Sequence, residues 1–383
     1  MAVVYTRTLL SADLATLVTT SDYTTNIQIV ANNAVRQVLS DVDLRSSKRK
    51  TALTPNLFSD VYDYAAPASL KGNKIIDIQA QVDRSKLNDW RLTTDAEFDT
   101  NKAENTIAIV DYDMVKKLRI SLDGGDDYIT VDGITKVSDW TLFGDGTNLT
   151  TDTDNFVYNS SSVNWDITDA GGTTAGIYND SLDAFDVSTY KTTGSAFVWA
   201  YISSTTNLTN FILRVGSSSS AYYYITVTTT NESLAFQNGW NLLRFDFANK
   251  ATTGTPDDDD CTYVALYMTK DEAKVSETDY RFNNLIIGNG SHYNVVYYSR
   301  YLWQSNAAVY LENSTATTDY LNCETDEYTL FLLKTAELTE RDAHNAEQAD
   351  KLEAKYLKKL AEYKMTYPSE ALLATQTYWE PTY

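Results

Sequence analysis

Aromatic side chains offer the clearest chemistry in this sequence, which contains 28 Tyr, 12 Phe and 7 Trp among 383 residues. Flat rings can stack on the apolar faces of sugars, and Tyr222, Tyr223, Tyr224 and Trp165 are the candidates for such a site. In a strand, Tyr222 and Tyr224 would share one face and Tyr223 would take the other. If one of these faces is solvent, at least one ring of the triplet is available to a ligand.

The alternative is that such rings fill a core. Trp199 lies between Val198 and Ala200, and Trp240 lies shortly before Leu242 and Leu243. Large rings in such apolar segments are usually buried, so a core position is favoured for both. For the tyrosine triplet both interpretations stay open.

Metal and cofactor sites are not predicted. The run Asp257–Asp260 could hold a hard cation, but consecutive carboxylates repel and point in different directions, so a solvated loop is favoured. The two histidines, His292 and His344, lie far apart in the sequence. Cys261 and Cys323 could form one disulfide, although two free thiols are favoured in a reducing compartment.

A compact basic cluster, Arg45, Lys48, Arg49 and Lys50, follows a predicted helix. These cations could contact DNA phosphates or the acidic surface of a neighbouring subunit. Alternatively, Arg45 complements the helix dipole and the others lie in a solvated turn. Both hypotheses stay open, but the net charge of −21 makes DNA the less favoured partner.

No catalytic motif is present: the sequence lacks GxSxG, HExxH and a glycine-rich phosphate loop followed by Lys. Paired carboxylates of a glycosidase are compatible with the composition, but no pair stands out. We therefore predict a protein that is not an enzyme and needs no cofactor. No stretch approaches the ~20 apolar residues that cross a bilayer, so no membrane association is predicted.

The charge distribution divides the chain into three segments. Residues 1–122 have a net charge of 0, residues 123–290 of −15, and residues 291–383 of −6. The acidic middle segment begins at Asp123-Gly124-Gly125 and ends at Gly288-Asn289-Gly290, and glycines give the backbone freedom to leave and re-enter a domain. We predict an inserted domain at 123–290 between two parts of one core, 1–122 and 291–383.

The flanks show helical periodicity. Apolar residues at three- and four-residue steps predict a helix over 24–44 and further helices over 330–338 and 349–367, with strands between 61 and 122. Four apolar positions of the last helix, Leu352, Tyr356, Leu360 and Tyr363, form a stripe that needs a partner. The middle segment instead shows about eight short aromatic strands, which predict a two-sheet sandwich or jelly roll. The predicted class is therefore α+β, a helical core with a small β part and an inserted all-β domain.

The flanks resemble bacteriophage head-to-tail adaptor or neck proteins. The resemblance rests on Asn33-Ala34-Val35, on Asp63–Pro67, on Trp90–Asp99 and on Tyr328–Glu337 with the charged helix that follows. It implies a homo-oligomeric ring, twelvefold by analogy with that family, which joins the portal protein to the tail with its terminal helices docked on the portal. DNA would pass only as cargo, and the subunit would assemble in the host cytoplasm into the neck of the virion.

The middle segment resembles carbohydrate-binding jelly-roll modules in the order of Leu182–Tyr190, Phe197–Ile202, Gly239–Asp246 and Asp279–Ile286. Such modules commonly carry an acidic residue near Asn283, so no calcium site is carried over. The leading hypothesis is a structural adaptor with an outward-facing jelly roll that could bind glycans. The alternatives are a glycan-binding tail fibre or adhesin, and a surface glycoside hydrolase.

Overall fold

The structure is a computed structural model that describes residues 4–20, 24, 26–53, 56–58, 61–80, 90–98, 105–112, 115–121, 128–270 and 276–372. Two compact units are present, and the chain passes between them more than once. Unit 1 comprises Met1–Ala52, Ala66–Thr93 and Asn294–Tyr383, and unit 2 comprises Leu53–Ala65 and Thr94–Tyr293.

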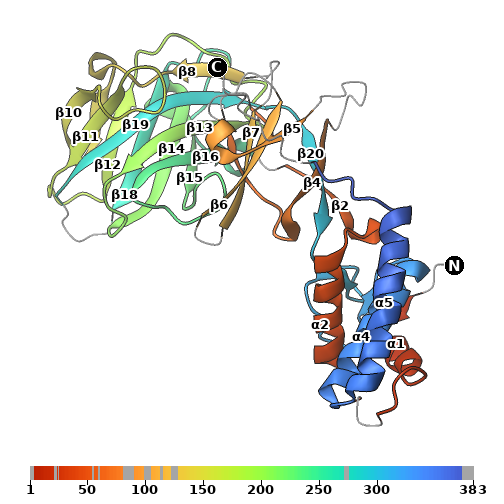
Figure 1. The fold of residues 1–383 in the computed structure, drawn as a ribbon. Helices are drawn as coiled ribbons and strands as arrows, with labels where there is room; N and C mark the ends of the chain where they lie inside the picture. The colour runs from red at the N-terminus through yellow and green to blue at the C-terminus, as the bar shows by residue number, and fades with distance from the viewer. Residues whose placement is uncertain are drawn as a thin grey trace, which may run out of the picture. The chain divides into compact units, whose positions relative to one another are not determined.

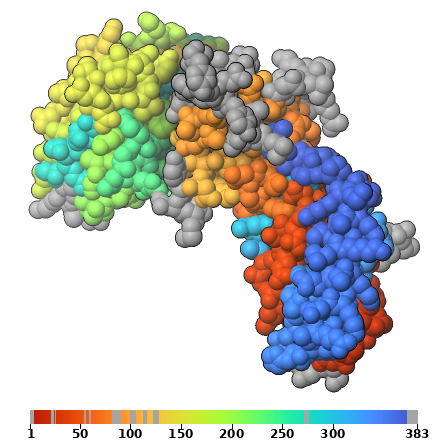
Figure 2. Space-filling model, viewed as in Figure 1, coloured from red at the N-terminus to blue at the C-terminus, as the bar shows by residue number. Residues whose placement is uncertain are grey.

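The helices of unit 1 form one packed group, in which the first and last parts of the chain lie side by side (Figures 1 and 2). Helix α2 buries Ala31, Val35 and Val38, the expected four- and three-residue steps, and ends where Val42 becomes extended. Helix α4 begins with a capping box made by Glu324 and Glu327. The helices of the unit are α1 (Arg7–Leu14), α2 (Ile27–Asp41), α4 (Thr325–Asp342) and α5 (Ala346–Thr366).

Tyrosine hydroxyls tie these helices together. Tyr328 donates to Asp13 at 2.7 Å, and Tyr356 donates to Asp41 at 2.6 Å. Burial is the main cause that raises the pKa of both tyrosines, so they remain protonated donors. Within the described part of the chain, no helix combines the length and the hydropathy of a membrane span.

Short strands complete unit 1. One sheet has the order β1-β23-β21-β22, and another has the order β2-β20-β4, in which β20 pairs with the distant β2. The bounds of the strands in these two sheets are β1 Tyr5–Thr6, β2 Lys48–Ala52, β4 Leu70–Ala80, β20 Tyr293–Ser299, β21 Trp303–Gln304, β22 Tyr310–Leu311 and β23 Tyr320–Leu321. Strand β5 (Arg91–Thr93) belongs to neither sheet.

The predicted α+β class with a helical core is wrong. The described residues form five sheets and only five α-helices, and no long N-terminal helical core exists among them. The predicted helix over 24–44 is the 15-residue α2. Much of the first flank forms strands that pair with distant segments, as β2 does with β20, and local periodicity does not report such pairing.

Unit 2 is built around a sandwich of two antiparallel sheets, as predicted for the middle segment (Figure 1). The first sheet has the order β10-β11-β19-β13-β16 with β8 on β19, and the second has the order β17-β15-β14-β18-β12-β9. The bounds are β8 Tyr128–Asp132, β9 Thr141–Gly144, β10 Gly146–Asp152, β11 Ser162–Ile167, β12 Thr174–Asn179, β13 Ser195–Ile202, β14 Leu208–Ser218, β15 Ala221–Val227, β16 Gly239–Asp246, β17 Ala251–Thr253, β18 Tyr263–Lys270 and β19 Glu277–Gly288.

The two-residue period of strands decides which side chains enter this core. In β13, Ala196, Val198, Ala200 and Ile202 point inward. Trp199 therefore points to the other side of the sheet and is only half-buried. The same holds for Trp240, because Leu243 and Phe245 are the inward residues of β16. The core positions expected for both tryptophans were wrong.

A smaller sheet in unit 2 contains β3 (Asp63–Ala65), β7 (Val115–Ser121) and β6 (Thr106–Tyr112). Along the chain, the short helix α3 (Asp95–Phe98) lies between β3 and β6, and the sandwich follows β7. The sequence predicts that segment 94–121 is part of the core formed by the two flanks. In the structure this segment belongs to the same compact unit as the sandwich. The predicted junction at Gly124-Gly125 lies outside the described residues, and the independence of segment 123–290 stays a prediction.

Asn283 of β19 is fully buried and organises one end of the first sheet. Its Oδ1 accepts from the backbone N–H groups of Val157 and Tyr158 at 3.0 and 2.6 Å. Its Nδ2 donates to the carbonyl oxygens of Gly133 and Ser161 at 3.1 and 3.0 Å. All polar capacity of the amide is used, so the loop before β11 is held by one side chain.

We predict that replacement of Asn283 by Asp destabilises the protein by roughly 3 kcal/mol, because a carboxylate would face two carbonyl oxygens without a donor. Chemical denaturation measures this change. The exposed Asn159 is the control, and its change to Asp should stay within about 0.5 kcal/mol. Equal stability of the two variants would contradict the role given to Asn283.

We also predict that residues 123–290 expressed alone fold cooperatively, because every member of the sandwich core lies between Ile129 and Ile287. Circular dichroism and a thermal melt of this fragment measure the outcome. A fragment without a cooperative melt would show that the sandwich depends on the rest of the chain.

Candidate functional site

The outward face of the second sheet carries aromatic rings where a solvated sheet would carry polar side chains. Register places Gly216 of β14 opposite Tyr222 of β15 on one side and opposite Tyr263 of β18 on the other. Likewise, Gly176 of β12 lies between Tyr267 and Phe143. The rings therefore flank positions that have no side chain.

The residues on this face differ in how deeply they are buried. Tyr263, Ala265 and Tyr267 are buried, and the half-buried Phe143, Tyr178, Ile212 and Tyr222 pack around them. The Phe143 and Tyr267 rings stack with centroids 4.4 Å apart and planes 24° apart. We call this set, together with Tyr224 and Arg214, the ring face.

The two glycines are required for this packing. An added Cβ at Gly176 would lie 2.6 Å from Cβ of Tyr267, and one at Gly216 would lie 2.8 Å from Cβ of Tyr222. Both distances are shorter than a carbon–carbon contact allows. A side chain at either position would therefore push away the neighbouring strand together with the tyrosine that it carries.

Arg214 occupies the middle of the ring face. Its guanidinium carbon lies 4.6 Å from the Tyr222 ring centroid, 4.9 Å from that of Tyr267 and 5.3 Å from that of Phe143. Its Nε is buried and has no hydrogen-bond partner among the described residues. Burial raises the pKa of Tyr267, while the charge of Arg214 and a hydrogen bond from it act in the opposite direction.

The tyrosine triplet divides as its alternation predicts. Tyr222 belongs to the ring face, and Tyr224 is 37% exposed with its ring 6.2 Å from that of Tyr222. Tyr223 points into the sandwich, and its hydroxyl donates to Asp258 at 2.5 Å. Tyr222 and Tyr224 are therefore accessible to a ligand, whereas Tyr223 has a structural contact.

Trp165, the fourth residue predicted to stack on a ligand, lies inside the sandwich core with no exposed surface. Its ring stacks on those of Tyr280 and Phe282 at centroid distances of 5.1 and 5.7 Å. The correction follows from strand pairing: Trp165 lies opposite Tyr280 in β19, on the side of the sheet that faces inward. Trp165 therefore has no open face for a ligand.

The acidic run Asp257–Asp260 has an internal role at Asp258. Asp258 forms an ion pair with Lys191 and accepts from Tyr223. No group of three or more His, Cys, Asp or Glu side chains among the described residues could hold a metal ion. Cys261 is a free buried thiol, and burial together with nearby aspartates raises its pKa to about 12.

Residues of the basic cluster already have partners within unit 1. Arg45 forms an ion pair with Glu324 at 3.4 Å, and Lys48 forms one with Glu370 at 2.5 Å. Arg49 donates hydrogen bonds to the carbonyls of Ser46, Lys48 and Tyr301, and Lys50 donates one to the amide oxygen of Gln79. The four cations are thus spread over separate contacts and do not form a common phosphate site.

The helical stripe predicted to meet a partner packs within unit 1. Leu352, Tyr356, Leu360 and Tyr363 are all less than a tenth exposed. Three of them, Tyr356, Leu360 and Tyr363, belong to the same core as the apolar face of α2, and Leu352 packs in a smaller cluster beside α1. The four residues therefore pack against other parts of this chain, and the predicted docking of the helix on another subunit stays a prediction.

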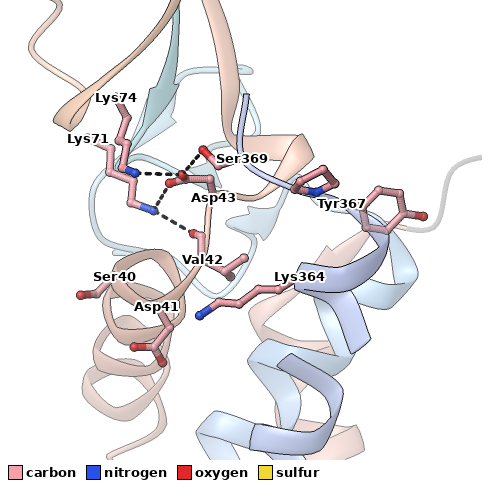
Figure 3. Close-up of a pocket in the computed structure, with 10 residues that line it drawn as sticks. Ser40, Asp41, Val42, Asp43, Lys71, Lys74, Lys364, Tyr367 and Ser369 are labelled. Carbon is pink, nitrogen blue, oxygen red and sulfur yellow. Dashed lines mark hydrogen bonds and ion pairs between the residues drawn. The ribbon is translucent and has the colours of Figure 1, made fainter. Parts of the chain in front are cut away.

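A hollow of about 340 Å³ in unit 1 lies between the end of α2, β4 and the end of α5 (Figure 3). Asp43 accepts from Lys71 at 2.6 Å and from Ser369 at 2.6 Å, and Lys74 lies 3.3 Å away. Burial opposes ionisation of Asp43, but these contacts lower its pKa overall. Lys364 extends from α5 into the hollow (Figure 3). This network ties three segments together, and both oxygens of the Asp43 carboxylate already have partners within it.

Several carbohydrate-binding modules of known structure are similar to less than half of this chain. No family model matches the sequence, and no curated protein matches it. Among solved structures, the family 11 carbohydrate-binding module from Clostridium thermocellum in complex with a β-1,3-1,4-mixed-linked tetrasaccharide is 14% identical, with 44% of this chain and 98% of that chain covered and a TM-score of 0.31. A xylan-binding domain from family 22 is 17% identical, with 43% and 92% covered and a TM-score of 0.25. A family 30 carbohydrate-binding module is 9% identical, with 42% and 97% covered and a TM-score of 0.31.

The contacts of Asp258 predict a pH dependence of stability. Burial alone would raise its pKa, but hydrogen bonds from Lys191 and Tyr223 and the charge of Lys191 lower it overall. The charged Asp258 carboxylate therefore stabilises the fold fully above its pKa in the unfolded chain, about 3.9. This stabilisation is lost as the pH falls through the lower pKa of Asp258 in the folded protein. We expect the stability gap between wild type and Asp258→Asn to shrink between about pH 6 and about pH 3.

Urea denaturation at the two pH values measures this gap. Asp260 lies in the same loop and is exposed, so the gap between wild type and Asp260→Asn should be the same at both. A gap for Asp258→Asn that does not change with pH would show that the carboxylate contributes nothing through its charge.

Proposed function

We propose that this protein binds glycans through the ring face of its β-sandwich. The observation that carries the proposal is an outward sheet face packed with aromatic rings around Arg214. Apolar rings that reach the surface can mark a site for a ligand or a partner, and here Tyr222 and Tyr178 are half-buried and Tyr224 is exposed. Here tyrosine hydroxyls and a guanidinium accompany the rings, which gives the face both stacking surfaces and hydrogen-bond donors.

A sugar ring matches this combination. Its C–H groups form an apolar patch that packs on the negative face of an aromatic ring, and its hydroxyls require donors and acceptors at the rim. Tyr222 and Tyr178 supply half-buried rings for the first purpose. Arg214 supplies donors for the second.

The dimensions favour a chain of sugars over a single one. The ring face extends across five adjacent strands, from β9 to β15. With neighbouring strands ~4.8 Å apart, this is a span of about 19 Å. Because the rings stand on hydrogen-bonded strands, little side-chain and backbone freedom would be lost on binding.

A protein partner is the competing interpretation, because Tyr and Arg are also enriched in the centres of protein–protein interfaces. The two interpretations predict different oligomeric states for the protein in the absence of glycan. A docking face for a second copy would give oligomers that change when the ring face is altered, whereas a glycan site would leave the oligomeric state unchanged.

For the protein's place in a particle, we favour an adhesin-type virion component over the neck adaptor. The ring face supports the first role, and the residues predicted to dock on a portal are buried within unit 1. The adaptor ring, its portal and tail partners, location in a virion, assembly in the host cytoplasm and absence of catalysis all stay predictions from the sequence.

Replacement of Tyr222 or Tyr178 by Ala should weaken binding to a responsive polysaccharide about tenfold each, since each change removes one stacking ring worth ~1 kcal/mol or more. Affinity electrophoresis against a panel of soluble polysaccharides measures this, with a thermal melt to confirm folding. Phe156 is a matched control, because it is 39% exposed and lies outside the ring face.

The proposal predicts that Phe156→Ala binds like wild type. Loss of binding in this variant as large as in the tyrosine variants, or unchanged binding in Tyr222→Ala and Tyr178→Ala, would overturn it. A panel without any binder, together with an oligomeric state altered by Tyr222→Ala, would favour the protein partner.

A further inference from the structure

Acidic residues are excluded from the second sheet. Segment 123–290 contains 23 Asp and Glu, yet strands β9, β12, β14, β15, β17 and β18 contain none. Their only charged residues are Arg214 and Lys270. Lys270 is 2% exposed and forms an ion pair with Asp145 at 2.7 Å. Arg214 is therefore the one charge that these strands place on the ring face.

Arg214 also differs from the other arginines of unit 2. Each of those forms an ion pair with at least one carboxylate, whereas Arg214 forms none with any residue that the structure describes. The paired residues are Arg119 with Asp63 and Asp95, Arg244 with Asp246, and Arg281 with Asp152 and Asp279. Although acidic residues are abundant in this chain, Arg214 has no carboxylate partner among the described residues, in contrast to the other three arginines.

The surroundings of Arg214 would strengthen an interaction with an anion. Three rings lie within 5.3 Å of its guanidinium, and they keep water away from its buried Nε. Charge–charge interactions gain strength where water is excluded. A guanidinium also presents paired N–H groups that match the two oxygens of a carboxylate.

From these observations we infer that the ring face selects glycan chains that carry carboxylate groups, such as uronic acids, with the carboxylate at Arg214 and neighbouring sugars on the rings. The inference rests on the proposed glycan binding and names the chemical class of the ligand. Neutral sugars could use the rings, but they would leave the charge of Arg214 without a counter-ion.

The acidity of the whole chain does not prevent this. At physiological ionic strength the Debye length is about 8 Å, so distant exposed carboxylates are largely screened. The acidic loop Asp257–Asp260 precedes β18, and Asp258 in that loop already pairs with Lys191. We therefore expect local contacts to decide the preference.

The test compares acidic polysaccharides with the same polymers after chemical reduction of their carboxylates to alcohols. Polygalacturonate, alginate and hyaluronan are suitable probes, each measured with the full chain by affinity electrophoresis and calorimetry. Reduction leaves the backbone of the polysaccharide intact and removes its negative charges. We expect at least one probe to bind about tenfold more weakly after reduction, and its affinity for the acidic form to fall with added salt.

Two variants separate charge recognition from a structural role. Arg214→Gln should weaken binding of the acidic form much more than binding of the reduced form, which loses only hydrogen bonds to hydroxyls, and Arg214→Lys should keep part of the preference. Thermal melts confirm that both fold. Equal weakening of both forms in Arg214→Gln would assign Arg214 a packing role and overturn the inference.

The outcomes also separate this inference from the proposed function. Equal wild-type binding of the acidic and reduced forms, weakened by Tyr222→Ala, would leave glycan binding intact and refute the charge preference alone. Failure to bind any acidic or neutral chain would refute both.

Discussion

The register that places Gly216 between Tyr222 and Tyr263 is the constraint on which the candidate site depends. Because side chains alternate along a strand, this register sends one set of residues into the sandwich core and the other set outward. The second sheet is apolar on both sides as a result. A shift of one residue in β15 would exchange the roles of Tyr222 and Tyr223 and remove both the ring face and the contact of Tyr223 with Asp258.

Charge is distributed as unevenly as the rings are. Acidic residues of the sandwich occur in the first sheet and in the loops, where several neutralise arginines such as Arg281 and Arg244. The second sheet keeps a single outward cation, Arg214, among aromatic rings. In unit 1, charged side chains connect segments of the same unit. Arg45 pairs with Glu324, and Asp13 accepts a hydrogen bond from Tyr328. The two units thus share an acidic composition but differ in what their charges do.

Sequence periodicity predicted the sandwich and the shared face of Tyr222 and Tyr224, because both follow from the two-residue repeat of strands. It could not tell which side of a strand faces the core, since that depends on pairing with distant strands. For this reason Trp165 was expected to be open and Trp199 to be buried, and the structure shows the reverse tendency. No local pattern marks Arg214, because the rings around it come from β9, β15 and β18, which lie far apart in the sequence. The stripe containing Tyr356 showed that helix α5 needs a partner but not which one.

The central claim is that a glycan chain lies on the outward face of the second sheet. Its most direct test is the NMR spectrum of the full chain with 13C-labelled tyrosine rings, recorded during titration with a polysaccharide that binds. The account predicts that the signals of Tyr178, Tyr222 and Tyr224 shift, while that of Tyr280 in the core stays in place. Shifts confined to tyrosines of unit 1 or of the first sheet would contradict it.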